Sequence, residues 1–373
     1  MTISRRAFLT WAGSTALTSF APPVFAQGKK GGGPSLSDEF LASGPPIIDT
    51  HAHLQALARS GMDWDGGLRT ALGNMDRLNI RRTLILPPPQ PYGFEAAYDL
   101  EFASAVKRNA SRFAIVAGGG SLNPMINRRR AETSVSTDVT REFDGVAAKI
   151  ADAGAVAFGE MTCEHFSGFV GHPYVSAPPD HPLFLRLADI AAERDLPIDL
   201  HMETVPADMA MPAPFRERSG FNPEKVAGNI ERFERLLAHN RKTRIVWVHL
   251  GWDVTGFRTL DLTRALLGRH ENLYLQLRPL PPPQPGAANV PLFNFVLTSE
   301  LKAEPAWSDL MAEYPDRFVL GSDSFYVAPG VDPRVRFAPP LPFVRPFVNS
   351  LPPDLGARVA HRNAGMLYKL PAL

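Results

Sequence analysis

Two histidines spaced two residues apart, His51 and His53, are the first residues in the sequence whose type and spacing suit metal chemistry. They follow the apolar pair Ile47-Ile48, which is typical of a buried parallel strand. Because side chains alternate along a strand, Asp49, His51 and His53 are expected on one face. Two imidazoles on one face can bind one metal ion together. A lone pair of this kind is more often a surface or hydrogen-bonded pair, so the prediction depends on what other strands carry.

Four further apolar segments end in residues that could bind a metal. Segments 155–160, 197–201, 244–249 and 318–323 finish in Glu160, His201, His249 and Asp323. Taken singly, Asp323 could cap a helix or turn, and His201 or His249 could be a satisfied core histidine. An apolar strand gains nothing from burying an unpaired imidazole or carboxylate, because that burial is costly. Convergence of all four on the histidine pair therefore predicts a cation site.

Short apolar runs alternate with stretches of helical periodicity from Pro45 onward, which indicates successive β-α units and a parallel sheet. The predicted strands are 47–51, 82–86, 113–117, 155–160, 197–201, 244–249, 272–278 and 318–323. Two helices are well marked, one with Asp180 as its N-cap and one opened by Asn222-Pro223. Eight such units favour an α/β fold of the closed (β/α)8 TIM barrel type, formed as one domain by residues 45–373.

Connections between the predicted elements differ in length on the two rims of this barrel. Helix-to-strand connections are short, as at 193–195 and 239–242, whereas strand-to-helix connections are long and rich in proline, as at 161–180 and 202–221. Long, proline-stiffened loops on one rim indicate an active site at the C-terminal ends of the strands.

The N-terminal residues 1–26 are predicted to be a targeting segment. Residues 4–9, SRRAFL, resemble the twin-arginine export motif, and the apolar run that follows is too short and too polar to span a membrane stably. Residues 24–26, VFA, fit the rule for signal cleavage, and 27–44 are predicted to form a flexible leader. We therefore expect a bacterial, periplasmic protein that is exported by the twin-arginine translocation machinery without stable membrane insertion.

Composition excludes several classes of function. The formal net charge is +1 and no basic cluster occurs beyond the N-terminus, so nucleic acid is not an expected partner. Cys163 is the only cysteine among 373 residues, which excludes an internal disulfide. A small molecule is the expected partner.

Together, the motifs resemble the amidohydrolase superfamily, and within it the branch called amidohydrolase-related or amidohydrolase 2. They are Asp49-Thr50-His51-Ala52-His53, Gly159-Glu160, Leu200-His201-Met202, Val248-His249-Leu250-Gly251-Trp252, Gly321-Ser322-Asp323 and Asn363-Ala364-Gly365-Met366-Leu367-Tyr368. The resemblance implies that His51, His53 and Asp323 hold one divalent metal, and that His201 and His249 hold a second ion or orient water. Many binuclear members carry a carboxylated lysine where this chain has Glu160, and glutamate can also bridge two ions. One or two ions per chain are therefore expected, with zinc as the expected metal.

The predicted activity is hydrolysis of a small-molecule ester, lactone or amide by metal-activated water. Asp323 and His249 are the predicted catalytic residues, with Asp323 carrying a proton to the leaving group. Two alternatives stay open. One is a metal-dependent, non-oxidative decarboxylase of an aromatic or unsaturated carboxylic acid, a reaction found in the same branch with one metal, in which Arg278 would bind the carboxylate. The other is a non-catalytic metal- or solute-binding protein.

Five more residues are predicted to lie around the metal. Arg278 follows the seventh strand on its inward parity, where it could clamp a substrate carboxylate or form a rim salt bridge. His165 and Trp252 lie in strand-to-helix loops and are candidate substrate contacts. Asp49 and Asp199 fall one layer below the ligands and are predicted to accept histidine N–H groups.

Overall fold

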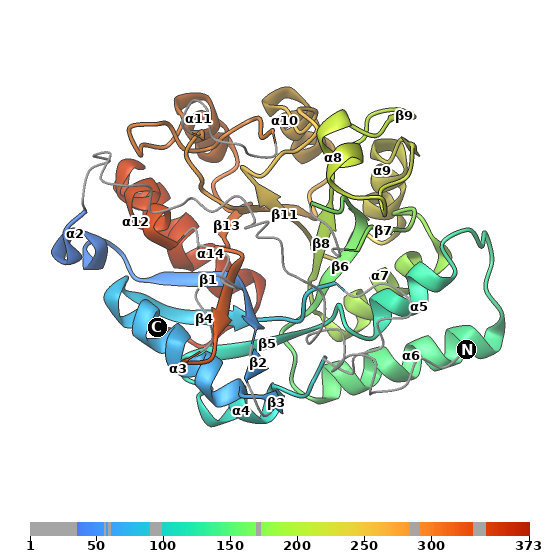
Figure 1. Ribbon diagram of the computed structural model, residues 1–373, viewed down its shortest axis with the longest axis horizontal. Coiled ribbons are helices and arrows are strands. Elements are labelled where there is room, and N and C mark those ends of the chain that lie inside the picture. The colour runs from blue at the N-terminus through green and yellow to red at the C-terminus, as the bar shows by residue number, and fades with distance from the viewer. Residues whose placement is uncertain are drawn as a thin grey trace.

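The chain folds into a closed barrel of parallel strands with helices around it (Figure 1). The computed structural model describes residues 36–55, 57–58, 61–89, 99–168, 173–283, 291–330 and 341–373. The predicted export signal and the first part of the leader lie outside these residues. None of the helices in the described part of the chain is long and apolar enough to cross a membrane.

Eight strand positions, the last of them split in two, make the barrel wall. In chain order the strands are β1 (Ile47–Gln55), β4 (Ile80–Ile85), β5 (Phe113–Gly118), β6 (Ala157–His165), β8 (Ile198–Met202), β11 (Ile245–Leu250), β12 (Leu273–Leu277), β13 (Phe318–Leu320) and β14 (Ser324–Val327). Each strand pairs in parallel with the next, and the barrel closes because β13 pairs with β12 while β14 pairs with β1. The (β/α)8 barrel predicted from the sequence is confirmed.

Helices cover the outer face of this barrel. The main ones are α3 (Trp64–Arg77), α4 (Ala103–Arg108), α5 (Leu122–Arg128), α6 (Thr137–Asp152), α7 (Pro182–Arg194), α9 (Ile230–His239), α10 (Leu260–Arg269), α11 (Pro305–Glu313) and α12 (Leu341–Ser350). Their buried apolar side chains form one large core with the outward side chains of the strands, such as Leu273, Leu275 and Leu277 of β12.

Shorter elements occupy the connections and the chain ends. They are α2 (Asp38–Ala42), β2 (Leu57–Ala58), β3 (Gly61–Met62), β7 (Val175–Ser176), β9 (Met209–Ala210), α8 (Ala213–Arg218), β10 (Lys225–Val226), α13 (Pro353–Ala357), the π-helix η2 (Arg358–Arg362) and α14 (Asn363–Leu367). Helix α2 corrects the prediction of a leader that is flexible up to residue 44. The leader is ordered there because Arg345 of α12 donates hydrogen bonds to the carbonyl oxygens of Leu41 and Pro45.

Two predicted helix starts are wrong. Helix α7 is capped by His181, whose Nδ1 accepts a main-chain N–H at 3.2 Å, because Asp180 is drawn instead into an ion pair with Arg235 of α9. Helix α9 begins at Ile230 and not at Asn222, because the Asn222 side chain donates to the carbonyl oxygens of Ser167, after β6, and Phe215, in α8.

Apolar side chains fill the N-terminal end of the barrel interior. They are Ile48, Leu84, Leu86, Val116, Ala157, Val246, Val248 and Val319. Ala364, Leu367 and Tyr368, in and just after α14, pack against this layer, so the C-terminal segment closes that end. Polar side chains are left to gather at the other end, where the strand-to-helix loops begin.

Candidate metal centre

The first strand departs from regular alternation at its histidines. Ile48 and Thr50 both face the barrel interior, Ile48 in the apolar layer and Thr50 through a hydrogen bond from the Gln276 side chain. The pairing of β1 with β4 shifts register after Asp49, and beyond the shift His51 also faces inward. The two histidines share one face, as predicted, but Asp49 does not lie on it, because a bulge re-aims the side chain that follows it.

The same kind of break occurs at three other predicted ligands. Register shifts in β6 and β11 span Glu160 and His249, and His249 has a left-handed φ of 64°. Asp323 lies in the gap between β13 and β14 with φ of 51°. Each of these side chains thus reaches the barrel mouth at a point where regular strand geometry is interrupted.

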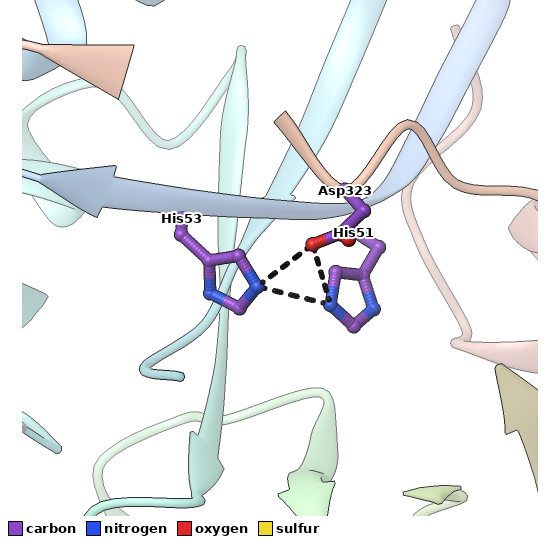
Figure 2. A group of neighbouring side chains, drawn as sticks. All are labelled: His51, His53 and Asp323. Atoms are coloured by element: carbon purple, nitrogen blue, oxygen red, sulfur yellow. Dashed lines mark hydrogen bonds and ion pairs between the residues drawn. The ribbon is translucent and has the colours of Figure 1, made fainter. Parts of the chain in front are cut away.

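Three side chains form the centre of the site, with both histidine rings directed at one carboxylate oxygen (Figure 2). The Nε2 atoms of His51 and His53 lie 3.2 Å apart, and they lie 3.8 and 3.2 Å from Asp323 Oδ1. Glu160 Oε2 lies 3.5 and 3.6 Å from the same two nitrogens. Tetrahedral zinc, with bonds of about 2.0–2.2 Å, places its ligand atoms roughly 3.3–3.6 Å apart. The spacing of the His51, His53 and Asp323 group is close to what a bound divalent ion requires, and Glu160 forms a second, overlapping group of possible ligands with His51 and His249.

Protonation at the centre also favours a cation. The Nδ1 of His53 lies 3.0 Å from the carbonyl oxygen of Leu86, which can only accept, so this nitrogen carries the proton. Whenever the ring is neutral, its Nε2 lone pair faces the same point as oxygens of Glu160 and Asp323. Several buried acceptors that converge in this way need a positive charge between them.

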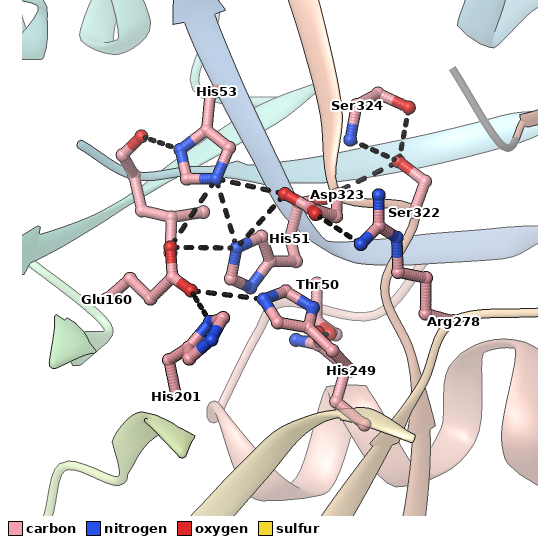
Figure 3. A network of polar contacts seen from close by, with 12 residues as sticks. Thr50, His51, His53, Glu160, His201, His249, Arg278, Ser322, Asp323 and Ser324 are labelled. Carbon is pink, nitrogen blue, oxygen red and sulfur yellow. Dashed lines mark hydrogen bonds and ion pairs between the residues drawn. The ribbon is translucent and has the colours of Figure 1, made fainter. Parts of the chain in front are cut away.

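His201 lies beside this centre, with its ring directed at the Glu160 carboxylate (Figure 3). Its Nδ1 is 2.8 Å from Glu160 Oε1 and its Nε2 is 3.3 Å from Glu203 Oε1. Although burial disfavours its charge, these hydrogen bonds raise the pKa of His201 to about 10. Because both ring nitrogens lie within hydrogen-bond distance of carboxylates, this arrangement favours the predicted orienting role of His201 over its predicted ligand role. Glu203 was missed, although its position two residues after His201 is the inward parity of a strand.

His249 has one ring nitrogen to spare. Its Nε2 lies 3.0 Å from Glu160 Oε1, so it carries the proton and donates it to the carboxylate. Burial lowers the pKa of His249 to about 3, which agrees with a neutral ring. Its buried Nδ1 is then an acceptor, and it has no hydrogen-bond partner among the residues described.

Arg278 is tied to the centre. Its Nη1 lies 2.9 Å from Asp323 Oδ2, and its guanidinium carbon lies 4.2 Å above the Trp252 ring. Of the two predicted roles of Arg278, the structure shows the salt bridge. Burial alone would raise the pKa of Asp323, but the charge of Arg278 and the nearby histidines hold it below its usual range.

The two predicted supporting aspartates bind other partners than histidine rings. Asp49 accepts the main-chain N–H groups of Ser322 and His51, at 2.8 and 3.2 Å, and the Ser322 hydroxyl at 2.6 Å. Asp199 accepts the hydroxyl of Tyr368 at 2.7 Å. Asp49 therefore ties the main chain of the histidine strand to the residue before Asp323, whereas Asp199 ties the barrel to its C-terminal segment.

Loops after the strands add an apolar cover near these residues. Six buried side chains from the loops after β6, β8 and β11 form a separate cluster, namely Phe166, Val205, Met211, Phe215, Val226 and Val254, and Trp252 packs against it. His165, at the end of β6, has its ring 4.7 Å from that of His201. Both predicted substrate contacts, His165 and Trp252, thus lie next to residues of the centre.

The fold and this site define a (β/α)8 barrel with a candidate metal centre at the C-terminal ends of its strands. Residues 48–370 match the model of a family described as amidohydrolase, so the chain belongs to the amidohydrolase family. No curated protein matches the sequence.

Three solved structures illustrate the likeness. A 4-oxalomesaconate hydratase from Rhodopseudomonas palustris has a TM-score of 0.47 at 12% identity, over 87% of this chain and 95% of its own. An amidohydrolase 2 from Bifidobacterium longum subsp. infantis has a TM-score of 0.43 at 11% identity, over 88% and 100%. A dihydroxybenzoic acid decarboxylase from a Polaromonas species, with bound manganese and an inhibitor, has a TM-score of 0.40 at 12% identity, over 89% and 98%. Likenesses this distant say nothing about the reaction of this chain.

Proposed function

We propose that the protein is a metal-dependent hydrolase that cleaves a small-molecule ester, lactone or amide. The observation that carries the proposal is the position of the Nε2 atoms of His51 and His53, which lie 3.2 Å apart and each 3.2–3.8 Å from one oxygen of Asp323 and one oxygen of Glu160. These residues would hold a divalent ion, and zinc suits a mixed set of imidazoles and carboxylates. When bound, such an ion supplies Lewis acidity that makes water more acidic and polarises a carbonyl group.

Glu160 favours one ion per chain over two. Its Oε2 faces His51 and His53, whereas its Oε1 accepts hydrogen bonds from His201 and His249. An oxygen that already accepts two N–H groups has little capacity left for a second ion. His201 and His249 would then orient the Glu160 carboxylate toward the ion, as hydrogen-bonded neighbours of metal ligands commonly do.

We assign the proton-transfer role to His249. Its Nδ1 is a buried acceptor without a hydrogen-bond partner in the described chain, and this unused lone pair supports a role in taking a proton from water and returning it to a leaving group. This assignment replaces Asp323, because one oxygen of that carboxylate faces the two histidines and the other is paired with Arg278.

Hydrolysis is favoured over decarboxylation by the state of Arg278. Decarboxylation of an aromatic acid, the alternative found in the same branch with one metal, would use Arg278 to bind the substrate carboxylate. In the structure this guanidinium is paired with Asp323 and stacked on Trp252. A buried base without a hydrogen-bond partner in the described chain, beside the ligands, also favours an enzyme over a protein that only binds metal or solute.

A panel assay tests the proposal. The chain would be stripped with a chelator, reloaded with zinc, and offered esters, lactones, amides and aromatic carboxylic acids. We expect metal-dependent acid release from at least one neutral class, and its loss in His53→Ala. The matched control is His239→Ala, which changes a more exposed histidine paired with Asp189 and should keep full activity. Release of carbon dioxide without any hydrolysis, or no turnover by zinc-loaded protein, would overturn the proposal.

A further inference from the structure

Arg258 is a buried arginine that binds main-chain carbonyl groups. It is 3% exposed, and its Nη1 and Nη2 donate to the carbonyl oxygens of Val248 and Trp247 at 2.6 and 2.9 Å. Its guanidinium carbon also lies 3.9 Å above the Trp247 ring. These carbonyls belong to the two residues immediately before His249. The guanidinium therefore binds β11 at the point where the pairing of β11 with β12 shifts register.

Hydrogen bonds to Asp253 fix the loop after β11, which leads back to that strand at Arg258. One oxygen of Asp253 accepts the main-chain N–H groups of Thr255 and Gly256, at 3.1 and 3.0 Å. The other oxygen accepts the main-chain N–H of Arg258 at 3.1 Å and the Asn294 side chain at 2.6 Å. A carboxylate that caps several N–H groups of one short loop fixes its path. The main chain of Arg258 is therefore held in a fixed position relative to β11.

Regular alternation would place His249 on the wrong face. Trp247 packs in the outer core under the helices and Val248 packs in the inner layer, so the next residue of a regular strand would face the helices. His249 faces the barrel instead, and its Nε2 reaches Glu160 at 3.0 Å. Its φ of 64° is unfavourable for a residue other than glycine, so the conformation must be held by its surroundings.

We propose that Arg258 is a positioning residue that turns His249 into the barrel. Because it stacks on Trp247, the guanidinium lies on the helix-facing side of β11, the side to which alternation would direct His249. There it pairs with two carbonyl groups that lie at the break in the strand. The consequence for catalysis rests on the proposed proton-transfer role of His249, whereas the consequence for the orientation of the ring does not.

The test uses the signals of the histidine rings. Zinc-loaded protein labelled with carbon-13 in histidine would be studied by NMR, with the His249 signal assigned from His249→Gln. In Arg258→Met we expect the His249 signal to shift or broaden while bound zinc and the signals of His51 and His53 persist. Arg258→Lys, which can keep one hydrogen bond, should give a smaller change.

Arg345→Met is the matched control. Arg345 is also fully buried and donates to three main-chain carbonyls, those of Leu41, Pro45 and Leu78, outside the candidate centre. Its loss should lower the melting temperature and leave the His249 signal unchanged. If Arg258→Met fails to fold, Arg258→Ala is used instead. Added methylguanidinium should then restore the wild-type His249 signal, whereas methylammonium should not.

An unchanged His249 signal in folded Arg258→Met, or an Arg258→Ala signal that methylguanidinium leaves displaced, would overturn the proposal. Once a hydrolysed substrate is known, Arg258→Met should lower kcat roughly 10- to 100-fold with little change in KM. It should lower kcat no further in a His249→Gln background, because the two residues would act as one unit. A displaced ring without hydrolytic activity would refute the proposed function and leave the positioning role standing.

Discussion

Glu160 links two pairs of histidines through its two oxygens. Oε2 lies 3.5 and 3.6 Å from the nitrogens of His51 and His53, while Oε1 lies 2.8 and 3.0 Å from those of His201 and His249. The first distances fit groups that share an ion, and the second fit hydrogen bonds. A single carboxylate therefore separates side chains that would hold metal from side chains that would orient the site.

Asp49 is the residue whose loss should weaken the site without removing a ligand. Asp49→Ala leaves the buried N–H of Ser322 without its acceptor, at a cost of about 1–3 kcal/mol, and opens a cavity as well. We expect the free energy of unfolding in urea to fall by about 2–4 kcal/mol and the zinc affinity to fall roughly 10- to 100-fold. The reason is that Asp49 joins the strand of His51 to the turn that carries Asp323.

The control for this prediction is Asp261→Ala in α10, whose carboxylate is almost fully exposed. It should change the free energy of unfolding by less than about 0.5 kcal/mol. If Asp49→Ala had the same free energy of unfolding and the same zinc affinity as this control, Asp49 would have no positioning role.

Residue types at strand ends could be predicted from the sequence, but their partners could not. Glu160 and Asp323 follow apolar runs, and this pattern alone indicated that they meet at one rim. That His201 would donate to two carboxylates depends on Glu203 and on the rotation of one ring, which residue type does not specify. The pairing of Arg278 with Asp323 was one of two open alternatives, and only coordinates distinguish them.

At the scale of strands, apolar runs predicted where strands lie but not where they break. Alternation predicts one face for every second residue, whereas β1, β6 and β11 each shift register around the residue that enters the site. Such a break depends on tertiary contacts that alternation does not describe, and at β11 these include the hydrogen bonds from Arg258 to the carbonyl oxygens of Trp247 and Val248. Helix starts failed for a similar reason, because Asp180 is taken by an ion pair with α9.

Gly159, at the break in β6, should not tolerate a side chain. A Cβ there would lie 2.8 Å from Asp199 Cβ and 3.1 Å from a methyl carbon of Val116, and neither atom can rotate far away. We expect Gly159→Ala to lower the free energy of unfolding by about 1–3 kcal/mol through overpacking. Urea unfolding of the metal-free protein measures this effect apart from zinc binding.

The matched variant is Gly145→Ala in the middle of α6. An added Cβ there meets nothing within 4 Å. Alanine in a helix interior should then raise the free energy of unfolding by about 0.5–1 kcal/mol. A Gly159→Ala protein as stable as wild type would mean that β6 does not need close contact at this point.

At the scale of the whole molecule, the barrel divides its interior by polarity. The C-terminal segment and an apolar layer fill one end, and the candidate centre occupies the other. This division follows from the order of side chains along each strand, which is why the barrel and the rim of its site could be predicted from the sequence. That the C-terminal segment closes one end of the barrel was not predicted, because this closure depends on tertiary contacts of a short helix.

We propose that the protein is exported to the periplasm, since residues 4–9 resemble a twin-arginine motif. Replacement of Arg5 and Arg6 by lysine should leave the protein in the cytoplasm, because the translocation receptor reads the arginine pair. Cell fractionation followed by immunoblotting measures the distribution, with a Lys29→Arg, Lys30→Arg chain as the charge-matched control. Normal periplasmic amounts of the Lys-Lys variant would contradict the proposal.

The central claim is that His51, His53, Glu160 and Asp323 hold one divalent ion. Anomalous X-ray scattering from a zinc-loaded crystal, recorded on both sides of the zinc absorption edge, tests it most directly. We predict one strong anomalous peak per chain at about 2.0–2.2 Å from the Nε2 atoms of both histidines and from Asp323 Oδ1, with Glu160 Oε2 facing the same ion. Absence of a peak at that point, or a second peak of equal height between Glu160 Oε1, His201 and His249, would contradict the account.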